Sequence, residues 1–535
     1  MRLIDYLDKG ASLDAEAPCL ICDGEVKTYA DVQELSGRVA AALVADGVQP
    51  GDKVAILSTN DPTSFTCVFG ISRAGAVWCP INPRNEAREN RELLELFECS
   101  VLIFQASFAS LVEAIRSALP RLRTLVCLDD DLEWAARWED FLARGTEPVD
   151  RRCPDDLTMI VGTGGTTGRP KGVMLPGPSI ETMTAITLMS YPWPRDGARP
   201  TYLALAPLTH AAGVLCFPVL CHGGSIVIMR TPDIAGFLDH VEHNRITHTF
   251  LPPTLIYMLL DHPTLDERNL SSLQCFWYGA APMSASRLEE ALNRIGPVMA
   301  QLFGQTEAPM MISTMAPRDH YDSDGAIARA RLASAGRPSP LVTVAIMADD
   351  GRLLERGERG EIVLRSSLVM RGYFNDGAAT AEASAHGWHH TGDIGYLDDD
   401  GFLFIVDRAK DMVITGGFNV YSAEVEQALM AHPAVADCAV IGLPDDKWGE
   451  RLTAVLQIRH GSTLDPEELK SFVKARIGSV KTPKQIEIWE DLPRSKIGKV
   501  LKTEIKKEFL DLDALTGHHG PARAHPGPGP RFIGP

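Results

Sequence analysis

Glycine and threonine alternate in one short segment, Gly162-Thr163-Gly164-Gly165-Thr166-Thr167-Gly168-Arg169-Pro170-Lys171-Gly172. Glycine permits positive φ and close approach of the backbone, so successive N–H groups can point into one concavity. The threonine hydroxyls add hydrogen-bond donors, and Lys171 adds a positive charge. The segment lacks the spacing and the Gly-Lys-Ser/Thr ending of a P-loop. It is typical either of polyphosphate binding or of a simple turn, and the rest of the chain must decide between them.

Five further segments carry side chains that could do chemistry together. They are Tyr278-Gly279-Ala280-Ala281-Pro282, Phe303-Gly304-Gln305-Thr306-Glu307-Ala308, His390-Thr391-Gly392-Asp393, Asp407-Arg408-Ala409-Lys410-Asp411 and Pro493-Arg494-Ser495-Lys496-Ile497-Gly498-Lys499. The first is interpreted as a strand end that opens into small residues. The second is interpreted as a loop with an aromatic ring, a hydroxyl and a carboxylate. The third places the carboxylate of Asp393 in a turn, the fourth concentrates charge, and the fifth ends in a lysine.

Alternating helix and strand patterns surround these segments. Val32, Leu35 and Val39 share one face of a helix that ends near Gly47, and a strand is expected over Lys53–Leu57. Further strands are expected at Pro18–Cys22, Ala76–Cys79, Leu203–Ala206 and Ser225–Met229. This alternation predicts layered α/β sheets rather than a helical bundle.

The later part of the chain has a different pattern of expected secondary structure. From about residue 340, short strands alternate with Asp/Gly turns, and a small α/β segment follows, whose clearest helix begins at Asp465. We therefore expect an α/β fold whose large N-terminal domain, residues 1–408, combines layered α/β subdomains with a β-rich subdomain. A small, mobile α+β C-terminal domain is expected over residues 409–516. The Gly/Pro/His-rich tail, residues 517–535, is expected to be disordered.

Composition argues against several classes of partner. The chain has 535 residues, enough for two or more domains, and its formal net charge is −18 at pH 7. That charge argues against nucleic acid or an anionic membrane. No signal peptide is expected, and no apolar run reaches the ~18 residues of a transmembrane helix. The scattered cysteines, including an isolated pair at Cys19 and Cys22, are expected to be free thiols in a reducing cytoplasm.

In order and spacing, the six segments resemble those of the acyl-CoA synthetases in the adenylate-forming superfamily, which also contains peptide-synthetase adenylation domains and firefly luciferase. The resemblance extends from Lys27-Thr28-Tyr29-Ala30 to Lys499. It implies that ATP and a carboxylic acid form an acyl-adenylate and pyrophosphate, and that a thiol, usually coenzyme A, then takes the acyl group. Because a carboxylate must attack an anionic phosphate, the first step needs positioning and cations aimed at the developing charge.

The resemblance assigns the polyphosphate and its metal to particular residues. Those of the proposed pyrophosphate cradle are Thr163, Gly164, Gly165, Thr166, Thr167, Gly168 and Lys171. The family often has serine where Gly164 stands, so one hydroxyl donor is missing. Thr306 would bond the α-phosphate, and Glu307 would hold Mg²⁺, a hard cation that prefers carboxylate and phosphate oxygens. Lys499 would reach the acid and the α-phosphate at once.

The adenosine is assigned in the same way. The residues around the base would be Gly279, Ala280, Ala281, Phe303, Gly304 and Gln305. Phe303 would stack on the adenine. Asp393 would accept hydrogen bonds from the ribose hydroxyls, and Arg408 would offer a cation and fork donors nearby.

The resemblance also places an acid pocket. The residues assigned to it are His210, Ala211, Ala212, Tyr278 and Met310. No acidic residue occurs between Pro207 and Pro218, so an α-amino acid, which would need a partner for its ammonium group, is not expected. His210 would lie beside the acyl group or gate its entry, and the small residues after it leave room for a bulky, ring-bearing or long acyl group. Fatty, aryl and alicyclic acids remain open.

Two further assignments concern the second step. Lys410 corresponds to the hinge about which the small domain rotates in the family, since one pocket cannot suit both reactions. Gly416 and Gly417 match the loop beside the pantetheine arm of coenzyme A, and a simple hairpin turn is the alternative. The histidines at 386, 389 and 390 are interpreted as support for Asp393 rather than as a metal site.

We therefore expect a cytoplasmic acid–CoA ligase that uses ATP, Mg²⁺ and coenzyme A, with homodimer formation left open. One alternative is an acyl-AMP ligase that delivers to a carrier protein. Such relatives usually carry an insertion near the start of the small domain, and none is found between Arg408 and Glu424. The other alternative is a non-catalytic adenylate-binding regulator, and the presence of Lys499, Glu307 and Asp393 together argues against it.

Overall fold

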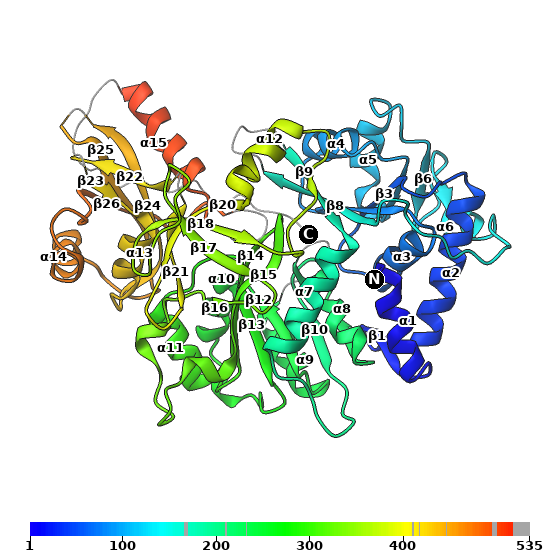
Figure 1. Ribbon diagram of the computed structural model, residues 1–535, viewed down its shortest axis with the longest axis horizontal. Helices are drawn as coiled ribbons and strands as arrows, with labels where there is room; N and C mark the ends of the chain where they lie inside the picture. Colours follow the sequence, from blue (N-terminus) through cyan, green and yellow to red (C-terminus); the bar gives the residue numbers. More distant parts are fainter. Residues whose placement is uncertain are drawn as a thin grey trace.

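The computed structural model describes residues 1–164, 170–208, 211–231, 233–408, 411–416, 418–445, 447–494 and 500–516. In this part of the chain, three sheets and their helices form a large body, and a five-stranded sheet with its helices forms a smaller one. Figure 1 shows the smaller body, coloured orange and red, at one end of the molecule beside the β-rich part of the large body. The expected α/β class, with a large N-terminal and a small C-terminal unit, is confirmed.

The central sheet has nine strands in the order β16-β15-β14-β13-β12-β10-β11-β1-β2. Their bounds are β1 Pro18–Cys22, β2 Glu25–Thr28, β10 Thr201–Ala204, β11 Ser225–Ile228, β12 His248–Leu251, β13 Cys275–Gly279, β14 Met299–Gln305, β15 Ala308–Met315 and β16 Arg337–Pro338. Strands β1 and β10 to β14 are parallel, whereas β2, β15 and β16 join antiparallel. The carboxyl ends of β10, β12, β13 and β14 therefore share one edge, where ligands bind in open α/β sheets.

The second sheet, here called the N-terminal sheet, has eight strands in the order β19-β9-β8-β4-β3-β5-β6-β7. Their bounds are β3 Lys53–Leu57, β4 Val77–Ile81, β5 Val101–Phe104, β6 Thr124–Cys127, β7 Ala136–Arg137, β8 Leu157–Gly164, β9 Pro170–Pro176 and β19 Gly372–Tyr373. Strand β9 returns antiparallel to β8, and the short β19 adds to β9 from a distant part of the sequence.

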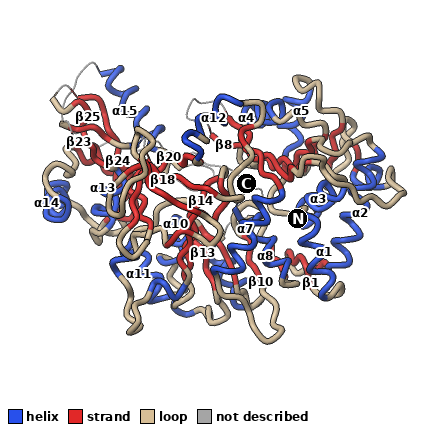
Figure 2. Tube along the Cα trace, in the orientation of Figure 1, coloured by secondary structure: helices blue, strands red, loops and turns tan. Residues whose placement is uncertain are grey.

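Helices fill and cover the two sheets, as Figure 2 shows. Between the sheets lie α1 Leu3–Leu13, α2 Tyr29–Ala45, α3 Pro62–Arg73, α7 Gly177–Ser190 and α8 Ala211–Cys221, which share one buried core with strands of both sheets. The outer faces carry α4 Ala87–Leu96 and α5 Ala109–Arg116 on the N-terminal sheet, and α9 Ile234–His243, α10 Pro253–Leu260 and α11 Ala285–Arg294 on the central sheet. Shorter helices lie at α6 Trp138–Leu142, Ala106–Phe108, Leu265–Glu267, Pro317–His320, Arg329–Arg331 and Ala385–Gly387. The arrangement is a five-layered α/β/α/β/α stack.

Local signals explain where several elements begin. Thr28 caps α2: its hydroxyl accepts a hydrogen bond from the Asp31 amide, and the Asp31 carboxylate accepts one from the Thr28 amide. Such a cap stabilises a helix by about 1 kcal/mol. The predicted strands Pro18–Cys22 and Lys53–Leu57 are confirmed with the same bounds.

The β-rich part of the large body is a four-stranded antiparallel sheet in the order β17-β18-β20-β21. Its strands are β17 Thr343–Met347, β18 Gly360–Arg365, β20 His389–Leu397 and β21 Leu403–Arg408, with α12 Gly377–Ala383 in the connection before β20. This confirms the short strands expected after residue 340. Strand β20 continues through Asp393, which sequence patterns place in a turn.

The smaller body contains strands β22 Val413–Thr415, β23 Phe418–Val420, β24 Val435–Asp445, β25 Gly449–Ile458 and β26 Gln485–Ile488, with helices α13 Ser422–Met430, α14 Pro466–Ile477 and α15 Lys502–Thr516. The predicted cap of α14 is present, because the Asp465 carboxylate accepts a hydrogen bond from the Glu467 amide. The chain leaves the β-rich sheet at Arg408 and enters the next sheet at Val413. Division of the chain at 408/409 remains a prediction.

Polar contacts join the two bodies. The Asp407 carboxylate accepts hydrogen bonds from the amide and the hydroxyl of Ser422, the first residue of α13. Lys502 donates to the same hydroxyl and forms an ion pair with Glu426 at 2.8 Å. At the other side of the interface, Gln427 donates to the carbonyl of Met283. These contacts define how the small body is seated on the large one.

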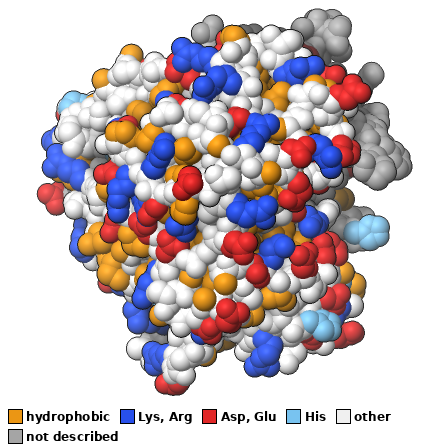
Figure 3. All heavy atoms as spheres, turned by 90° about the vertical axis from the view of Figure 1, so that its right-hand side faces the viewer, with side chains coloured by type: hydrophobic (Ala, Val, Ile, Leu, Met, Phe, Trp, Pro, Cys, Tyr) orange, Lys and Arg blue, Asp and Glu red, His pale blue; other side chains and the backbone are white. Residues whose placement is uncertain are grey.

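The surface carries charge of both signs. On the face shown in Figure 3, basic and acidic side chains are interspersed, and neither sign dominates. Within the described ranges, none of the helices combines the length and the apolar character that crossing a bilayer requires.

Candidate active site

The glycine- and threonine-rich segment joins two antiparallel strands. Its first part belongs to β8 and its last part to β9, and Thr163 lies directly opposite Lys171 in the register of the pair. The tip of the segment, which includes the predicted Gly165, Thr166, Thr167 and Gly168, lies outside the described residues. The hairpin brings a hydroxyl and an ammonium group to the same end of the N-terminal sheet.

The segment from Phe303 to Ala308 is mostly strand rather than loop, which corrects the sequence interpretation. Phe303, Gly304 and Gln305 belong to β14, and only Thr306 and Glu307 form the turn to β15. A Cβ atom at Gly304 would lie 2.4 Å from the amide nitrogen of Met310 in β15, so only glycine allows this close approach. The tight turn presents its hydroxyl and its carboxylate at the end of the central sheet.

The neighbouring strand β13 ends in the small residues that were predicted along the adenine edge. Gly279 is buried, and a Cβ atom there would lie 2.3 Å from the carbonyl oxygen of Leu302 in β14. Ala280 follows with a φ of 66° and is exposed, and Ala281 is half-buried. Because β13 and β14 are adjacent and parallel, these residues and Phe303 lie at neighbouring strand ends.

Glu307 is held by main-chain and side-chain contacts. Its carbonyl accepts a hydrogen bond from the Met370 amide at 2.7 Å. One of its carboxylate oxygens, Oε1, accepts a hydrogen bond from the Tyr373 hydroxyl at 2.9 Å. The same tyrosine ring lies under the Lys171 ammonium, which is 4.6 Å from the ring centroid. Two predicted site residues from different sheets therefore meet on one tyrosine.

Asp393 and Arg408 face each other on β20 and β21. Arg408 Nε lies 3.0 Å from Asp393 Oδ1, and the aspartate side chain is only 6% exposed whereas that of the arginine is 42% exposed. Asp393 lies in the strand because a bulge, not a turn, accommodates Gly392, whose φ is 71°. The Gly392 amide donates to Glu361 of β18, which compensates for the interrupted ladder.

His389 supports the other side of this region. The Gln305 amide nitrogen donates to His389 Nε2 at 3.1 Å. Burial, with a smaller contribution from neighbouring His390, lowers the pKa of His389 from 6.5 to about 4, so the ring is neutral and can accept this hydrogen bond. His390 lies between Glu361 and the carbonyl of Ala385. Both rings therefore have structural partners.

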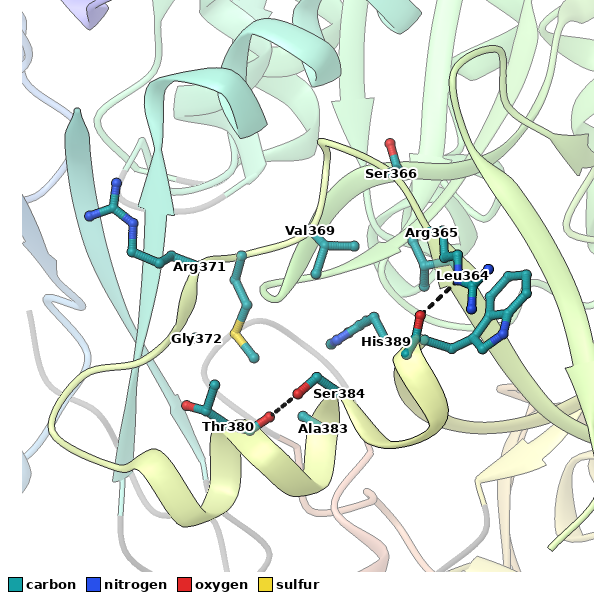
Figure 4. A pocket seen from close by; sticks show the side chains of 13 residues that line it. Leu364, Arg365, Ser366, Val369, Arg371, Gly372, Thr380, Ala383, Ser384 and His389 are labelled. Carbon is teal, nitrogen blue, oxygen red and sulfur yellow. Dashed lines mark hydrogen bonds between the residues drawn. The ribbon is translucent and has the colours of Figure 1, made fainter. Parts of the chain in front are cut away.

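A pocket of about 410 Å³ opens next to His389. Figure 4 shows His389 directed into it from the start of β20, with Thr380 of α12 and Ser384, directly after this helix, at the opposite side. One of its lining residues, His389, forms the hydrogen bond with the predicted nucleotide residue Gln305.

The loop that the sequence assigns to the acid pocket is held by Asn60, which follows β3 of the N-terminal sheet. The Asn60 amide nitrogen donates to the carbonyls of Ala206 and Met229, at 3.1 and 3.0 Å. Its carbonyl oxygen accepts a hydrogen bond from the Leu208 amide at 2.8 Å. This asparagine therefore connects the N-terminal sheet to the segment of the central sheet that leads to His210. The predicted pocket residue His210 itself lies outside the described residues.

The other predicted pocket residues differ in position. Helix α8 begins at Ala211 and includes Ala212. Met310 is half-buried, next to the hairpin turn. Tyr278 is 1% exposed and packs in the core with α9 to α11, and its hydroxyl forms a hydrogen bond with His320 at 2.9 Å. It offers no surface to an acid, so its assignment to the pocket is corrected.

The residues predicted for the second step are only partly described. Gly416 lies between β22 and β23 with a φ of 58°, in a hairpin. Lys410, Gly417 and Lys499 lie outside the described residues. Arg494 and Val500, on either side of the segment that contains Lys499, form an antiparallel bridge.

The donor set of the described residues fits a magnesium nucleotide. Glu307 supplies a fixed carboxylate and Lys171 a cation, as a metal-bound polyphosphate requires. The buried Asp393 suits a ribose diol, which only donates hydrogen bonds to it. Small residues at the end of β13 leave the strand end open beside Phe303.

Sequence reasoning missed two residues of this region, Tyr373 and Asn60. Both act through contacts with residues more than 60 positions away in the sequence. The only local signals were a tyrosine after Gly372 and an asparagine three positions after the end of a buried strand. Neither pattern specifies a partner.

Comparisons with known proteins agree with this geometry. The family model described as AMP-binding enzyme matches residues 7–374, and the model of the AMP-binding enzyme C-terminal domain matches residues 424–499. Medium/long-chain-fatty-acid–CoA ligase FadD8 of Mycobacterium tuberculosis is 42% identical over 498 residues, which cover 89% of this chain and 85% of that protein. Feruloyl-CoA synthase of an Amycolatopsis species is 35% identical over 502 residues, which cover 93% of this chain and 97% of that protein.

A solved structure shows the same fold. The amide bond synthetase McbA of Marinactinospora thermotolerans matches with a TM-score of 0.86 and 29% identity, covering 95% of this chain and 100% of that chain. The resemblance inferred from the sequence motifs is confirmed by these matches. This chain belongs to the adenylate-forming AMP-binding enzymes, within the family of the acid–CoA ligases.

Proposed function

We propose that this chain joins an apolar carboxylic acid to coenzyme A at the expense of ATP, through an acyl-adenylate. The observation that carries the proposal is the meeting of Lys171 and Glu307 on Tyr373. It gathers a cation and a carboxylate from two sheets at one strand edge, where a magnesium-bound polyphosphate would need them.

In the first step, the acid carboxylate attacks the α-phosphate and pyrophosphate leaves. Lys171 and the Thr163 hydroxyl would hold the leaving pyrophosphate, and Thr306 would donate to the α-phosphate. Bound Mg²⁺ would supply charge neutralisation between the phosphates, held by Glu307. Lys499 would bring its ammonium to the acid and the α-phosphate, which lowers the repulsion between two anions.

The nucleoside would be held on the other side of the turn. Asp393 would accept hydrogen bonds from the ribose hydroxyls, and Arg408 would stay paired with it while it donates to the nucleotide. Phe303 would stack on the adenine, with Gly279 and Ala280 along its edge. The fixed position of Asp393 in β20 supports this role, because a preorganised acceptor loses little freedom on binding.

In the second step, the coenzyme A thiolate attacks the acyl carbonyl and AMP leaves. We place this step after a rotation of the small body about Lys410, which would withdraw Lys499 and bring Gly416 and Gly417 to the thiol. Rotation must break the contact between Asp407 and Ser422, which joins the bodies in the present arrangement.

The acid is proposed to be fatty, aryl or alicyclic. No acidic residue occurs between Pro207 and Pro218, and α8 begins with the small Ala211 and Ala212. Two of the relatives are named for a fatty acid and for a feruloyl group. His210 would lie beside the acyl group. We further propose that the enzyme works in the cytoplasm, which suits cysteines that form no disulfide within the described residues.

The test is AMP formation by the whole chain with ATP and Mg²⁺ over a panel of fatty, aryl and alicyclic acids, with and without coenzyme A. Turnover that needs coenzyme A, together with an acyl-CoA product, would support the proposal and identify the acid class. Acyl-adenylate without thioester would favour a carrier-protein acceptor instead. ATP binding without turnover on any acid would favour the regulator.

A further inference from the structure

One short segment fastens the two hairpins of the candidate site to each other. At one end of Met370–Phe374, the Met370 amide donates to the carbonyl of Glu307 at 2.7 Å. At the other end, the Phe374 amide donates to the carbonyl of Gly172 in β9 at 2.7 Å. The turn that carries the carboxylate and the hairpin that carries the lysine are thus joined through main-chain hydrogen bonds.

Tyr373 is the side chain of this segment that reaches both groups. Its hydroxyl donates to Glu307 Oε1 at 2.9 Å, and its ring lies 4.6 Å from the Lys171 ammonium. A ring attracts a cation through its quadrupole, and a carboxylate that accepts from the phenol polarises the ring in the same direction.

The backbone of Tyr373 is itself fixed from two sides. Its amide donates to the Thr380 hydroxyl of α12 at 2.9 Å, and Tyr373 pairs with Val173 in β9. A Cβ atom at Gly372 would lie 2.7 Å from Thr380, so the helix packs directly on this strand. A residue held in this way can impose a position on its partners rather than follow them.

We propose that Tyr373 is a positioning residue that sets the spacing between Glu307 and Lys171, through its hydroxyl and its ring respectively. The inference rests on the proposed function, in which Glu307 holds Mg²⁺ and Lys171 contacts the pyrophosphate. It implies that the hydroxyl matters for the metal and that the ring matters for the polyphosphate. The two contributions can therefore be separated by substitution.

The experiment compares Tyr373→Phe and Tyr373→Leu with the unchanged protein. ATP binding to the whole chain is measured by calorimetry, with Mg²⁺ and with EDTA, in the absence of acid. We expect Tyr373→Phe to weaken Mg²⁺-dependent ATP binding about tenfold, as outer-sphere partners of metal ligands typically do, and to leave binding in EDTA unchanged. Tyr373→Leu should weaken ATP binding in EDTA as well, because the Lys171 ammonium then lacks the aromatic ring against which it lies.

Kinetics give a second, independent readout. The Mg²⁺ concentration for half-maximal AMP formation should rise about tenfold in Tyr373→Phe, while the KM of the acid and the rate of thioester formation from preformed acyl-adenylate stay within about twofold. In a Glu307→Gln background, Tyr373→Phe should not raise the Mg²⁺ concentration for half-maximal AMP formation any further, since it acts through that carboxylate. The matched control is Tyr202→Phe, which removes a buried hydroxyl that has no hydrogen-bond partner within the described part of the chain.

Unchanged Mg²⁺ dependence in Tyr373→Phe would overturn the proposal. The proposal would also be overturned if ATP binding weakened, the KM of the acid rose and thioester formation slowed by the same factor. General destabilisation of the site would produce that result. Additive losses in the Glu307→Gln background would also overturn the proposal. Failure of the proposed function is distinguishable, because calorimetry measures Mg²⁺ and ATP binding even if no acid supports turnover.

Discussion

Arg408 Nε lies 3.0 Å from the carboxylate of Asp393, across the antiparallel pair β20 and β21. The aspartate is buried and the arginine is half exposed. Arg408 is also the last residue of β21, directly before the chain enters the small body. The pair therefore ties the proposed ribose acceptor to the place where we expect the domains to move.

Asp393→Asn should reduce kcat/KM for ATP by about 10- to 100-fold, because hydrogen bonds to a charged group contribute about 1.5–3 kcal/mol. The KM of the acid should change little. The measurement is AMP formation at varied ATP and fixed acid. Asp399→Asn, an exposed carboxylate of the same hairpin, serves as control. Wild-type kinetics for ATP in Asp393→Asn would contradict the ribose assignment.

Lys499→Ala should abolish acyl-adenylate formation and leave thioester formation from preformed adenylate largely intact. The reason is that its charge is needed only where two anions must meet. Each half-reaction is followed separately, by pyrophosphate release and by acyl-CoA formation. Lys507→Ala, a lysine of α15, is the control. An equal decrease in the rates of both half-reactions would contradict the role assigned to Lys499.

Gly417→Leu should have the opposite effect. A bulky side chain in the segment between β22 and β23 would block the approach of the pantetheine arm, while pyrophosphate release in the absence of thiol continues at the normal rate. The same pair of assays measures both steps. Slower adenylation with normal thioester formation would show that this hairpin does not serve coenzyme A.

Acid pH should destabilise the protein through buried neutral histidines. Burial lowers the pKa of His389, His248 and His320 from 6.5 to about 4. A group whose folded pKa is depressed contributes its full stability above the unfolded pKa and loses it as pH falls through the folded pKa. The free energy of unfolding should therefore decrease between pH 6.5 and 4, by up to about 3 kcal/mol for each histidine.

The check is urea denaturation at several pH values across that window. In His389→Gln, the slope of the free energy of unfolding against pH should fall by the equivalent of about one proton. The reason is that this variant has one histidine fewer that takes up a proton on unfolding. His460→Gln, at an exposed position in the small body, should leave the slope unchanged. A slope that is the same in His389→Gln and in the unchanged protein would contradict the neutral buried ring.

Lys502→Met should destabilise the interface between the two bodies. Lys502 is a half-buried cation beside the half-buried Glu426, and it donates to Ser422, which in turn donates to Asp407. Its removal leaves the buried Asp407 and the half-buried Glu426 without their cation, and we expect a cost below the about 3–5 kcal/mol that breaking a fully buried pair causes. Urea denaturation measures the loss, and Lys502→Met combined with Glu426→Gln should recover part of it. No recovery in the double variant would show that the ion pair is not the cause.

Much of the fold follows from local patterns. The strand over Lys53–Leu57 is a buried apolar run, and the helix after Asp465 has a capping residue and a proline at its first position. Such signals depend only on neighbouring residues, so the sequence alone is enough to place them. The order of the chemical segments likewise identified the family before any geometry was known.

The corrections have a common physical cause, which is contact between distant residues. Asp393 lies in a strand because Glu361 of another strand accepts the Gly392 amide and stabilises a bulge. Tyr278 faces the core with Phe276 because alternate residues of β13 share one side of the sheet, and there its hydroxyl meets the distant His320. Tyr373 was missed for the same reason, since its role depends on partners that no local pattern specifies.

The most direct test of the account is the fate of the carboxylate oxygen. An accepted acid labelled with ¹⁸O in its carboxyl group is incubated with ATP, Mg²⁺ and coenzyme A, and the AMP is analysed by mass spectrometry. Attack of the carboxylate on the α-phosphate, followed by cleavage of the acyl-adenylate by the thiol, predicts AMP that carries one ¹⁸O atom. Unlabelled AMP, or ADP in its place, would contradict the central claim.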